Sequence, residues 1–257
     1  MQFNEAQIQA IQHNTGPCMV IAGPGSGKTT VLTHRVRYLI ERYGVNPSDI
    51  LVITFTKAAA EQMKLKFKGL SEGRNSAVTF GTFHAVFFTI LKAAYNYSAH
   101  CIIKPQIQHE FVKDQMCRLE LEYDDEKEAV AGVLSEISCV KGGAFNIDEY
   151  ESRCIPPQSF RIMYRAYDDM LVRKHLIDFD DMIVQCRELL MQREDYKRAW
   201  QNKYKYILID EFQDINKAQF DVVRILADRY RNLFVVGDDD QSIYGFRGSA
   251  PQIMLDF

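Results

Sequence analysis

Short apolar runs alternate with amphipathic segments in the first third of the chain. The runs at 18–22, 51–55 and 77–80 have the length of buried strands, and each is followed by a segment expected to be helical. A further helix is expected before the first run, because Asn4 can cap it and Gln7 stands three residues on as the capping-box partner. This alternation predicts βαβ units and a parallel sheet covered by helices on both faces.

The alternation stops in the middle of the chain and resumes later. Residues from about 95 to 177 have the pattern of helices and loops. Strands are predicted again at 206–209 and 233–236, separated by a helix over about 216–230. We therefore expect an α/β domain that is interrupted by an inserted helical domain.

The composition of the 257 residues is that of an ordinary globular protein, with 47% apolar residues, 25% charged residues and a formal net charge of -3. These values exclude intrinsic disorder. No apolar run approaches the roughly 18 residues that a membrane helix needs, and the N-terminus has no signal-peptide pattern, so no membrane partner is expected. The six cysteines include no CxxC pair, which predicts reduced thiols in a cytoplasmic protein rather than a zinc site or a disulfide framework.

Charge is unevenly distributed along the chain. Residues 57–74 carry five basic side chains and only two acidic ones. A local basic stretch is what contact with phosphate groups requires, even in a protein whose total charge is slightly acidic. A solvated helix face has the same pattern, so both interpretations stay open.

A glycine-rich turn separates the first predicted strand from the helix that follows it. Glycines let backbone N–H groups close around a phosphate, and the helix N-terminus adds partial positive charge. In such a loop Lys28 contacts the β and γ phosphates of a nucleotide, and the Thr29 hydroxyl binds Mg²⁺. The strict motif is broken because Ala22 replaces its first glycine, and a turn with an incidental lysine is the alternative. The residues expected to bind ATP here are Ala22, Gly23, Pro24, Gly25, Ser26, Gly27, Lys28, Thr29 and Thr30.

Two adjacent acids follow the predicted strand at 206–209. Carboxylates at the carboxyl edge of a parallel sheet lie where nucleotides bind. Asp210 is expected to hold Mg²⁺, and Glu211 to act as general base on the attacking water. Taken alone, such a pair is most often a solvated turn, but Lys28 lies 182 positions earlier, which fits an insertion between two halves of a nucleotide-binding sheet.

Six segments occur in order along the chain: Phe3–Gln7, Ala22–Thr29, Thr54–Thr56 with Ala59 and Met63, Gly81–His84, Asp210–Asp214 and Val236–Gly248. Together they resemble the superfamily 1 DNA helicases of the UvrD, Rep and PcrA group, and Asp178–Met182 looks like a further family segment. The resemblance implies a RecA-like P-loop NTPase sheet formed by residues 1–92 and 178–257, with an inserted α-helical domain at 93–177. It also implies ATP-driven 3′→5′ translocation and unwinding of DNA, with ATP and Mg²⁺ as cofactors.

The resemblance assigns further nucleotide contacts. Gln7 looks like the glutamine that reads adenine, with the capping box as the alternative, and Arg35 resembles a residue near the base, with an exposed helix arginine as the alternative. Gln241 looks like the γ-phosphate sensor that links hydrolysis to DNA movement. Arg247 looks like a companion that reaches toward phosphate, and both are grouped with Lys28 as catalytic.

The DNA track of the family crosses the same domain. Residues at matching positions are Phe55, Thr56, His84, Tyr244 and Phe246. Aromatic rings stack on bases without reading sequence, whereas hydroxyl and imidazole groups contact the backbone. For Phe55 a place in the core is the alternative, because it ends a buried strand.

Segments of the family's second core domain, which carries arginines that complete the ATP site, have no match in this chain. We therefore expect the N-terminal fragment of a longer helicase, with single-stranded DNA, DNA junctions and the missing core domain as partners. The isolated chain is predicted to bind nucleotide weakly and to hydrolyse it very slowly. Alternatives are an ATP-gated DNA-binding or regulatory module without motor activity, a fragment of a helicase–nuclease subunit, and a P-loop kinase or NTPase that does not act on DNA.

Overall fold

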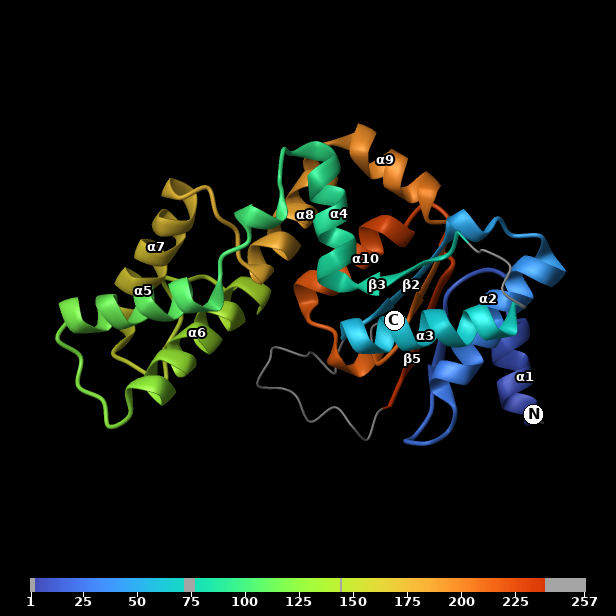
Figure 1. Ribbon diagram of the computed structural model, residues 1–257, viewed down its shortest axis with the longest axis horizontal. Coiled ribbons are helices and arrows are strands. Elements are labelled where there is room, and N and C mark those ends of the chain that lie inside the picture. Colours follow the sequence, from blue (N-terminus) through green and yellow to red (C-terminus); the bar gives the residue numbers. More distant parts are fainter. Residues whose placement is uncertain (1–2, 72–76, 144, 239–257) are drawn as a thin grey trace.

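The computed structural model describes residues 3–71, 77–143 and 145–238. Within these ranges five parallel strands form one sheet, in the order β1-β5-β4-β2-β3 (Figure 1). The strands are β1 (Cys18–Ile21), β2 (Ile50–Thr54), β3 (Thr79–Thr82), β4 (Tyr206–Ile209) and β5 (Leu233–Gly237). This order places β5 between β1 and β4, so the segments that follow these three strands meet at one edge of the sheet. The predicted α/β fold with a parallel sheet is confirmed.

Helices cover both faces of the sheet, as the strand–helix alternation predicts. Along β2, Leu51 and Ile53 pack into the apolar cluster on one face, whereas Ile50 and Val52 pack into the cluster on the other. Side chains of a strand point alternately to its two faces, so fully apolar runs bury both sides. One face carries α1 (Glu5–Gln12), α2 (Lys28–Tyr43) and α3 (Lys57–Leu70), and the other carries α4 (Phe83–Ala94), α8 (Phe179–Gln192), α9 (Glu194–Lys203) and α10 (Lys217–Ala227).

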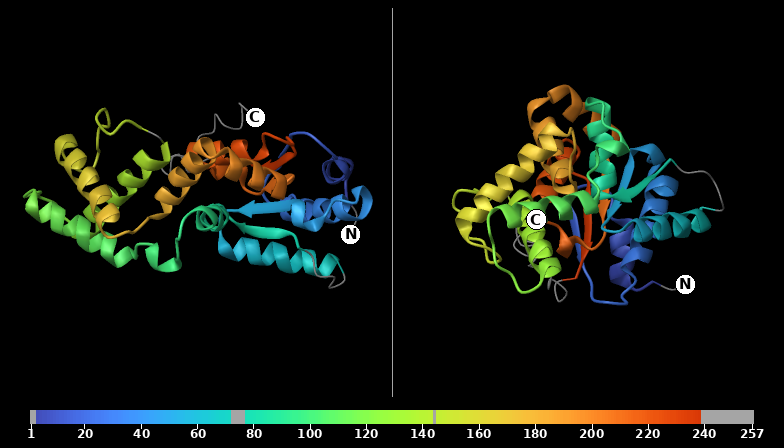
Figure 2. Two further views of the ribbon diagram at one scale, coloured as in Figure 1. Left: turned by 90° about the horizontal axis from the view of Figure 1, so that it is seen from above. Right: turned by 60° about the vertical axis from the view of Figure 1, so that its left-hand side comes forward.

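The helices between residues 103 and 173 pack around an apolar cluster of their own, which includes Val112, Val133 and Phe160. They are α5 (Pro105–Arg118), α6 (Glu126–Gly143) and α7 (Pro157–Arg173). These helices lie at one end of the elongated molecule, beside the sheet and its covering helices (Figure 2). The chain enters and leaves them side by side, because Ile102 and Ile177 form a parallel bridge.

Element boundaries agree with the sequence pattern to within one residue except at two places. The third strand was predicted at 77–80 but lies at Thr79–Thr82, because it pairs residue by residue with β2 and continues into the cap of α4 at Thr82. The helix predicted to 230 ends at Ala227. In the described part of the chain, short 3₁₀ helices lie at Pro47–Asp49, Ala99–Cys101 and Phe212–Asp214.

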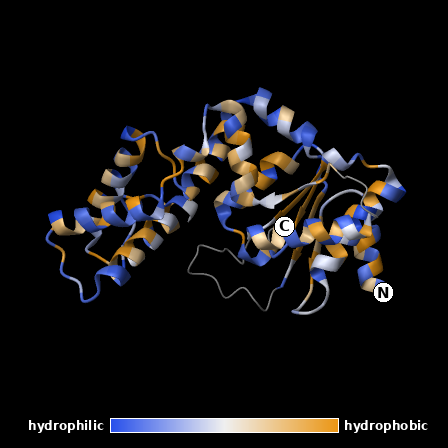
Figure 3. Cartoon of the chain, in the orientation of Figure 1, coloured by the Kyte–Doolittle hydropathy of each residue, from blue (hydrophilic) through white to orange (hydrophobic). Residues whose placement is uncertain are grey.

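The hydropathy of the chain follows this layering. The strands of the sheet are predominantly hydrophobic, and hydrophilic residues gather on the outer faces of the helices (Figure 3). None of the helices in the described ranges is both long enough and apolar enough to cross a membrane.

Candidate nucleotide-binding site

The glycine-rich segment forms a loop between β1 and α2, as predicted. Gly25 and Gly27 have φ of 73° and 85°, in the left-handed region that favours glycine. Gly27 caps α2 without a side-chain hydrogen bond, and the first turn of this 16-residue helix contains no acid. Among the described residues no side chain caps its first N–H groups, and the positive end of the helix dipole faces the loop. This arrangement is compatible with the binding of an anion.

Lys28 lies where the loop meets the ends of β4 and β5. Its ammonium nitrogen is 3.5 Å from Oε2 of Glu211 and 3.5 Å from Oδ2 of Asp238. The Lys28 side chain is only 10% exposed, and that of Asp238 is almost fully buried. The sheet order explains this meeting, because β1, β5 and β4 are neighbours and end at the same edge.

Thr29 and Asp210 form the second contact between the loop and β4. The Thr29 hydroxyl donates to Oδ2 of Asp210 at 3.4 Å. Burial of the Asp210 carboxyl, together with neighbouring Glu211, raises its pKa to about 6. A hydroxyl and a carboxylate oxygen at the side of a phosphate loop are the ligands that Mg²⁺ prefers, so these residues fit the predicted ion.

Glu211 has an uncommon backbone conformation, and hydrogen bonds hold its side chain in place. Its φ is 53°, which is uncommon for a residue other than glycine. Its Oε2 accepts a hydrogen bond from Nε2 of Gln213 at 2.9 Å, and Oε1 of Gln213 accepts one from the backbone N–H of Asp238 at 3.0 Å. Gln213 and Asp238 thus connect the ends of β4 and β5. Sequence reasoning gave neither residue a role, although both stand in segments that carry the family resemblance.

Gln7 reaches the loop from α1. Its Oε1 accepts from the backbone N–H of Asn4 at 3.0 Å, which confirms the capping box, and its Nε2 donates to the carbonyl of Ser26 at 3.0 Å. An amide carries two donor hydrogens and two acceptor lone pairs, so Nε2 of Gln7 can donate a second hydrogen bond and its Oε1 can accept a second one. Adenine contact by Gln7 therefore remains compatible with the capping box. Thr30 lies half-buried in the first turn of α2.

Arg35 is buried, so the alternative of an exposed helix arginine is wrong. Its side chain packs against the carboxyl-terminal end of α1, with Nη1 donating to the carbonyls of Ala10 and His13. Its guanidinium carbon lies 4.2 Å from the ring centroid of Phe234. Contact of Arg35 with the base stays a prediction.

The DNA-binding candidates that the structure describes follow β2 and β3. Phe55 packs partly on the core, with its ring 5.1 Å from that of Phe83, and the Thr56 hydroxyl caps α3. The His84 ring is 5.2 Å from the exposed ring of Phe179, and burial lowers the pKa of His84. The lysines of α3 are exposed, which is compatible with both interpretations of the basic stretch. Gln241, Tyr244, Phe246 and Arg247 lie outside the described residues.

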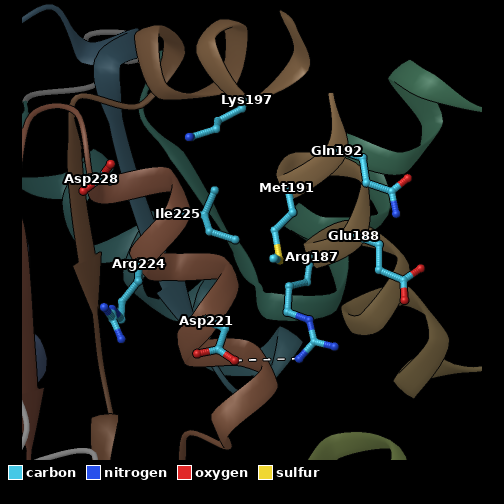
Figure 4. A pocket seen from close by; sticks show the side chains of 9 residues that line it. All are labelled: Arg187, Glu188, Met191, Gln192, Lys197, Asp221, Arg224, Ile225 and Asp228. Carbon is cyan, nitrogen blue, oxygen red and sulfur yellow. Dashed lines mark ion pairs between the residues drawn. The ribbon is translucent and has the colours of Figure 1, made fainter. Parts of the chain in front are cut away.

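A separate surface cleft of about 630 Å³ lies between α8, α9 and α10 (Figure 4). Its lining contains none of the predicted site residues. Met191 and Ile225 point into it, and Arg187 forms an ion pair with Asp221 at 3.7 Å on its rim. Acidic and basic side chains are equal in number around the cleft, so its charge favours neither an anionic nor a cationic ligand.

Comparison with known proteins identifies the family of this chain. The PcrA helicases of Staphylococcus epidermidis and Staphylococcus aureus, named as ATP-dependent DNA helicases, are each 35% identical in sequence to this chain over 267 residues. YjcD of Bacillus subtilis is 38% identical over 268 residues. These matches cover 99% of this chain but only 36%, 36% and 34% of the respective relatives, so the chain spans about a third of their length. The family model of the UvrD/REP helicase N-terminal domain matches residues 3–257, and the chain belongs to that family.

Proposed function

We propose that this chain is the ATP-binding N-terminal part of a DNA helicase that moves along single-stranded DNA in the 3′→5′ direction. The observation that carries the proposal is the meeting of Lys28, Asp210 and Glu211 beside an uncapped helix N-terminus. The relatives named as ATP-dependent DNA helicases support the activity. The polarity, the use of Mg²⁺ and the recognition of single strands and junctions rest on the resemblance in sequence motifs.

The phosphate end of the nucleotide is proposed to lie against the loop and Lys28. The N–H groups of the loop and of the first turn of α2 donate to phosphate oxygens. The Lys28 ammonium now lies between the carboxylates of Glu211 and Asp238. Phosphate oxygens that enter the site replace part of this pairing, so the lysine needs no large movement to bind them.

Thr29 and Asp210 would hold Mg²⁺, which offsets charge on the phosphate oxygens when bound. Glu211 is proposed to orient the attacking water and to take up its proton. Its side chain is 40% exposed, so water can reach it, and Gln213 and Lys28 fix its Oε2. Gln7 is proposed to contact adenine, because its amide already lies against the loop at Ser26.

Single-stranded DNA is proposed to cross the segments that follow β2 and β3. Phe55 and His84 supply a ring and an imidazole there, and Thr56 supplies a hydroxyl. The neighbouring Phe179 is 53% exposed at the start of α8, which supports a stacking contact with a base. Tyr244 and Phe246 are proposed to continue the track, and Gln241 and Arg247 to act on the γ phosphate, on the basis of their motif alone.

The helices between 93 and 177 are proposed to be an inserted domain, flanked by core segments 1–92 and 178–257. Their separate apolar cluster and the bridge that joins Ile102 to Ile177 support this division. The rest of the ATP site is proposed to come from a second core domain. Arginines supplied in this way contribute roughly 10³–10⁵ in rate in other nucleotide hydrolases, so the chain alone should hydrolyse ATP very slowly.

ATP hydrolysis with and without single-stranded DNA tests the proposal. The 257-residue chain, its Glu211→Gln variant and a control, Glu188→Gln, are compared at saturating Mg²⁺ and ATP. We expect slow hydrolysis by the chain and the control, and at least a tenfold lower rate for Glu211→Gln. Equal rates for all three proteins would contradict the role of Glu211. DNA binding that changes with nucleotide in the absence of any hydrolysis would favour a regulatory module.

A further inference from the structure

Arg35 is a charged side chain buried inside the nucleotide-binding half of the chain. It is only 2% exposed, and in the described ranges no carboxylate lies within ion-pair distance of it. Burial lowers the pKa of Arg35 to about 10, so the guanidinium is still charged at neutral pH. A buried charge is costly unless hydrogen bonds satisfy it. Nη1 of Arg35 is hydrogen-bonded, whereas its buried Nε has no hydrogen-bond partner among the described residues, so the function of the charge is sought at the Nη1 contacts.

Those contacts lie at the carboxyl-terminal end of α1. This helix has only eight residues, and its last turn contains no basic side chain. Helices this short need tertiary support in water. Arg35 donates to the carbonyls of Ala10 and His13, and the Tyr43 hydroxyl donates to that of Gln12 at 2.8 Å. Both donors come from α2, so α2 supplies hydrogen bonds to three carbonyls at the negative dipole end of α1.

The other end of α1 is joined to the start of α2. Nε2 of Gln7 donates to the carbonyl of Ser26, and a Cβ placed on Gly27 would lie 3.6 Å from the same nitrogen. The two helices lie side by side at the edge of the sheet (Figure 1). Gln7 is thus fixed beside the phosphate loop by one hydrogen bond to the loop and by the anchoring of its helix at Arg35.

We propose that Arg35 is a positioning residue for the base end of the nucleotide site. It acts through α1, because its hydrogen bonds hold this helix in the position from which the Gln7 amide can reach adenine. The inference rests on the proposed nucleotide site. Loss of Arg35 removes two of the hydrogen bonds that hold the end of α1 against α2 but leaves the loop, Lys28 and Thr29 in place, so adenine recognition is weakened while phosphate binding remains.

The test is the preference for adenine over guanine, measured by calorimetric titration of the 257-residue chain with MgADP and with MgGDP. We expect at least a tenfold preference for ADP in the unsubstituted chain. Arg35→Met should lower ADP affinity about tenfold and leave GDP affinity within about twofold. Arg35→Lys, which keeps the charge but not the planar fork, should retain part of the preference. Arg37→Met is the matched control, since Arg37 lies on the same helix but pairs with Glu41 at the surface.

A merely stabilising role for Arg35 would weaken both nucleotides equally and leave their ratio unchanged, and this result would overturn the inference. The inference would also be overturned if the unsubstituted chain bound ADP no more tightly than GDP. If Arg35→Met does not fold, Arg35→Lys combined with Gln7→Ala decides: the pair should be no less selective than Gln7→Ala alone. Failure of the proposed function is distinguishable, because the chain would then bind neither nucleotide, or Lys28→Ala would bind both as well as the unsubstituted chain.

Discussion

Substitution of Lys141 by methionine should destabilise the protein far more than loss of an ordinary surface lysine. The Lys141 ammonium, at the end of α6, lies 2.7 Å from Asp181, 2.9 Å from Asp178 and 3.0 Å from Asp168. Burial alone would lower the pKa of Lys141, but these carboxylates outweigh it and raise the pKa. Methionine fills similar space but leaves the acids without their cation. Removing one partner of a buried ion pair costs about 3–5 kcal/mol, and we expect a loss of that size.

The loss should depend on pH in a defined direction. Burial, followed by the charge of Asp178, raises the pKa of Asp181 to about 6 even with Lys141 present. Without the lysine this pKa rises further above its value in the unfolded chain. The folded state then holds its proton more tightly, so the free energy of unfolding falls as pH rises through the folded pKa. The cost of Lys141→Met is therefore largest at pH 8 and smaller at pH 5.

Urea unfolding at the two pH values measures this cost. The matched control is Lys113→Met, because Lys113 pairs with Glu126 at 2.8 Å but both side chains are exposed. Exposed pairs contribute little because water and salt screen them, so the control should lose little stability at either pH. Equal losses for Lys141→Met and Lys113→Met, or a Lys141→Met loss that does not change with pH, would refute the reasoning.

Three further outcomes follow from the site and its surroundings. Burial raises the pKa of Asp180 to about 7, so Asp180→Asn should stabilise the protein at pH 8. In urea unfolding, its gain in free energy of unfolding should be up to about 3 kcal/mol larger at pH 8 than at pH 5. Gln213→Ala leaves the buried N–H of Asp238 without its acceptor and should cost about 1–3 kcal/mol in urea unfolding. Phe179→Ala should weaken single-stranded DNA binding by about 1–3 kcal/mol in fluorescence anisotropy without loss of stability, whereas Phe83→Ala, at a buried position, should cost about 3–5 kcal/mol in stability.

Much of the fold follows from patterns that are local in the sequence. The strand at 206–209 is found where it was predicted, since four apolar residues with polar neighbours favour a buried strand. The helix that begins at the phosphate loop ends at Tyr43, next to the predicted Gly44, whose φ of 65° is the conformation for which glycine is preferred at a helix end. The third strand was misplaced because Gly81 interrupts its apolar pattern, and its position is set by pairing with β2.

Parts of the candidate site could not be predicted because they depend on packing between distant segments. The loop around Lys28 and the pair at Asp210 have local motifs. The link through Gln213 depends on β4 lying beside β5, which no local pattern indicates. The burial of Arg35 likewise depends on α1 packing along α2, since an arginine on an amphipathic helix is usually exposed.

The most direct test of the central claim is an experimental structure of this chain with MgADP. The account predicts that the β phosphate lies against the N–H groups that follow Gly23, within hydrogen-bond distance of the Lys28 ammonium. It also predicts that the metal contacts the Thr29 hydroxyl and that the adenine lies beside Gln7. A nucleotide found in another place, such as the cleft between α8 and α10, with the loop around Lys28 empty, would contradict the account.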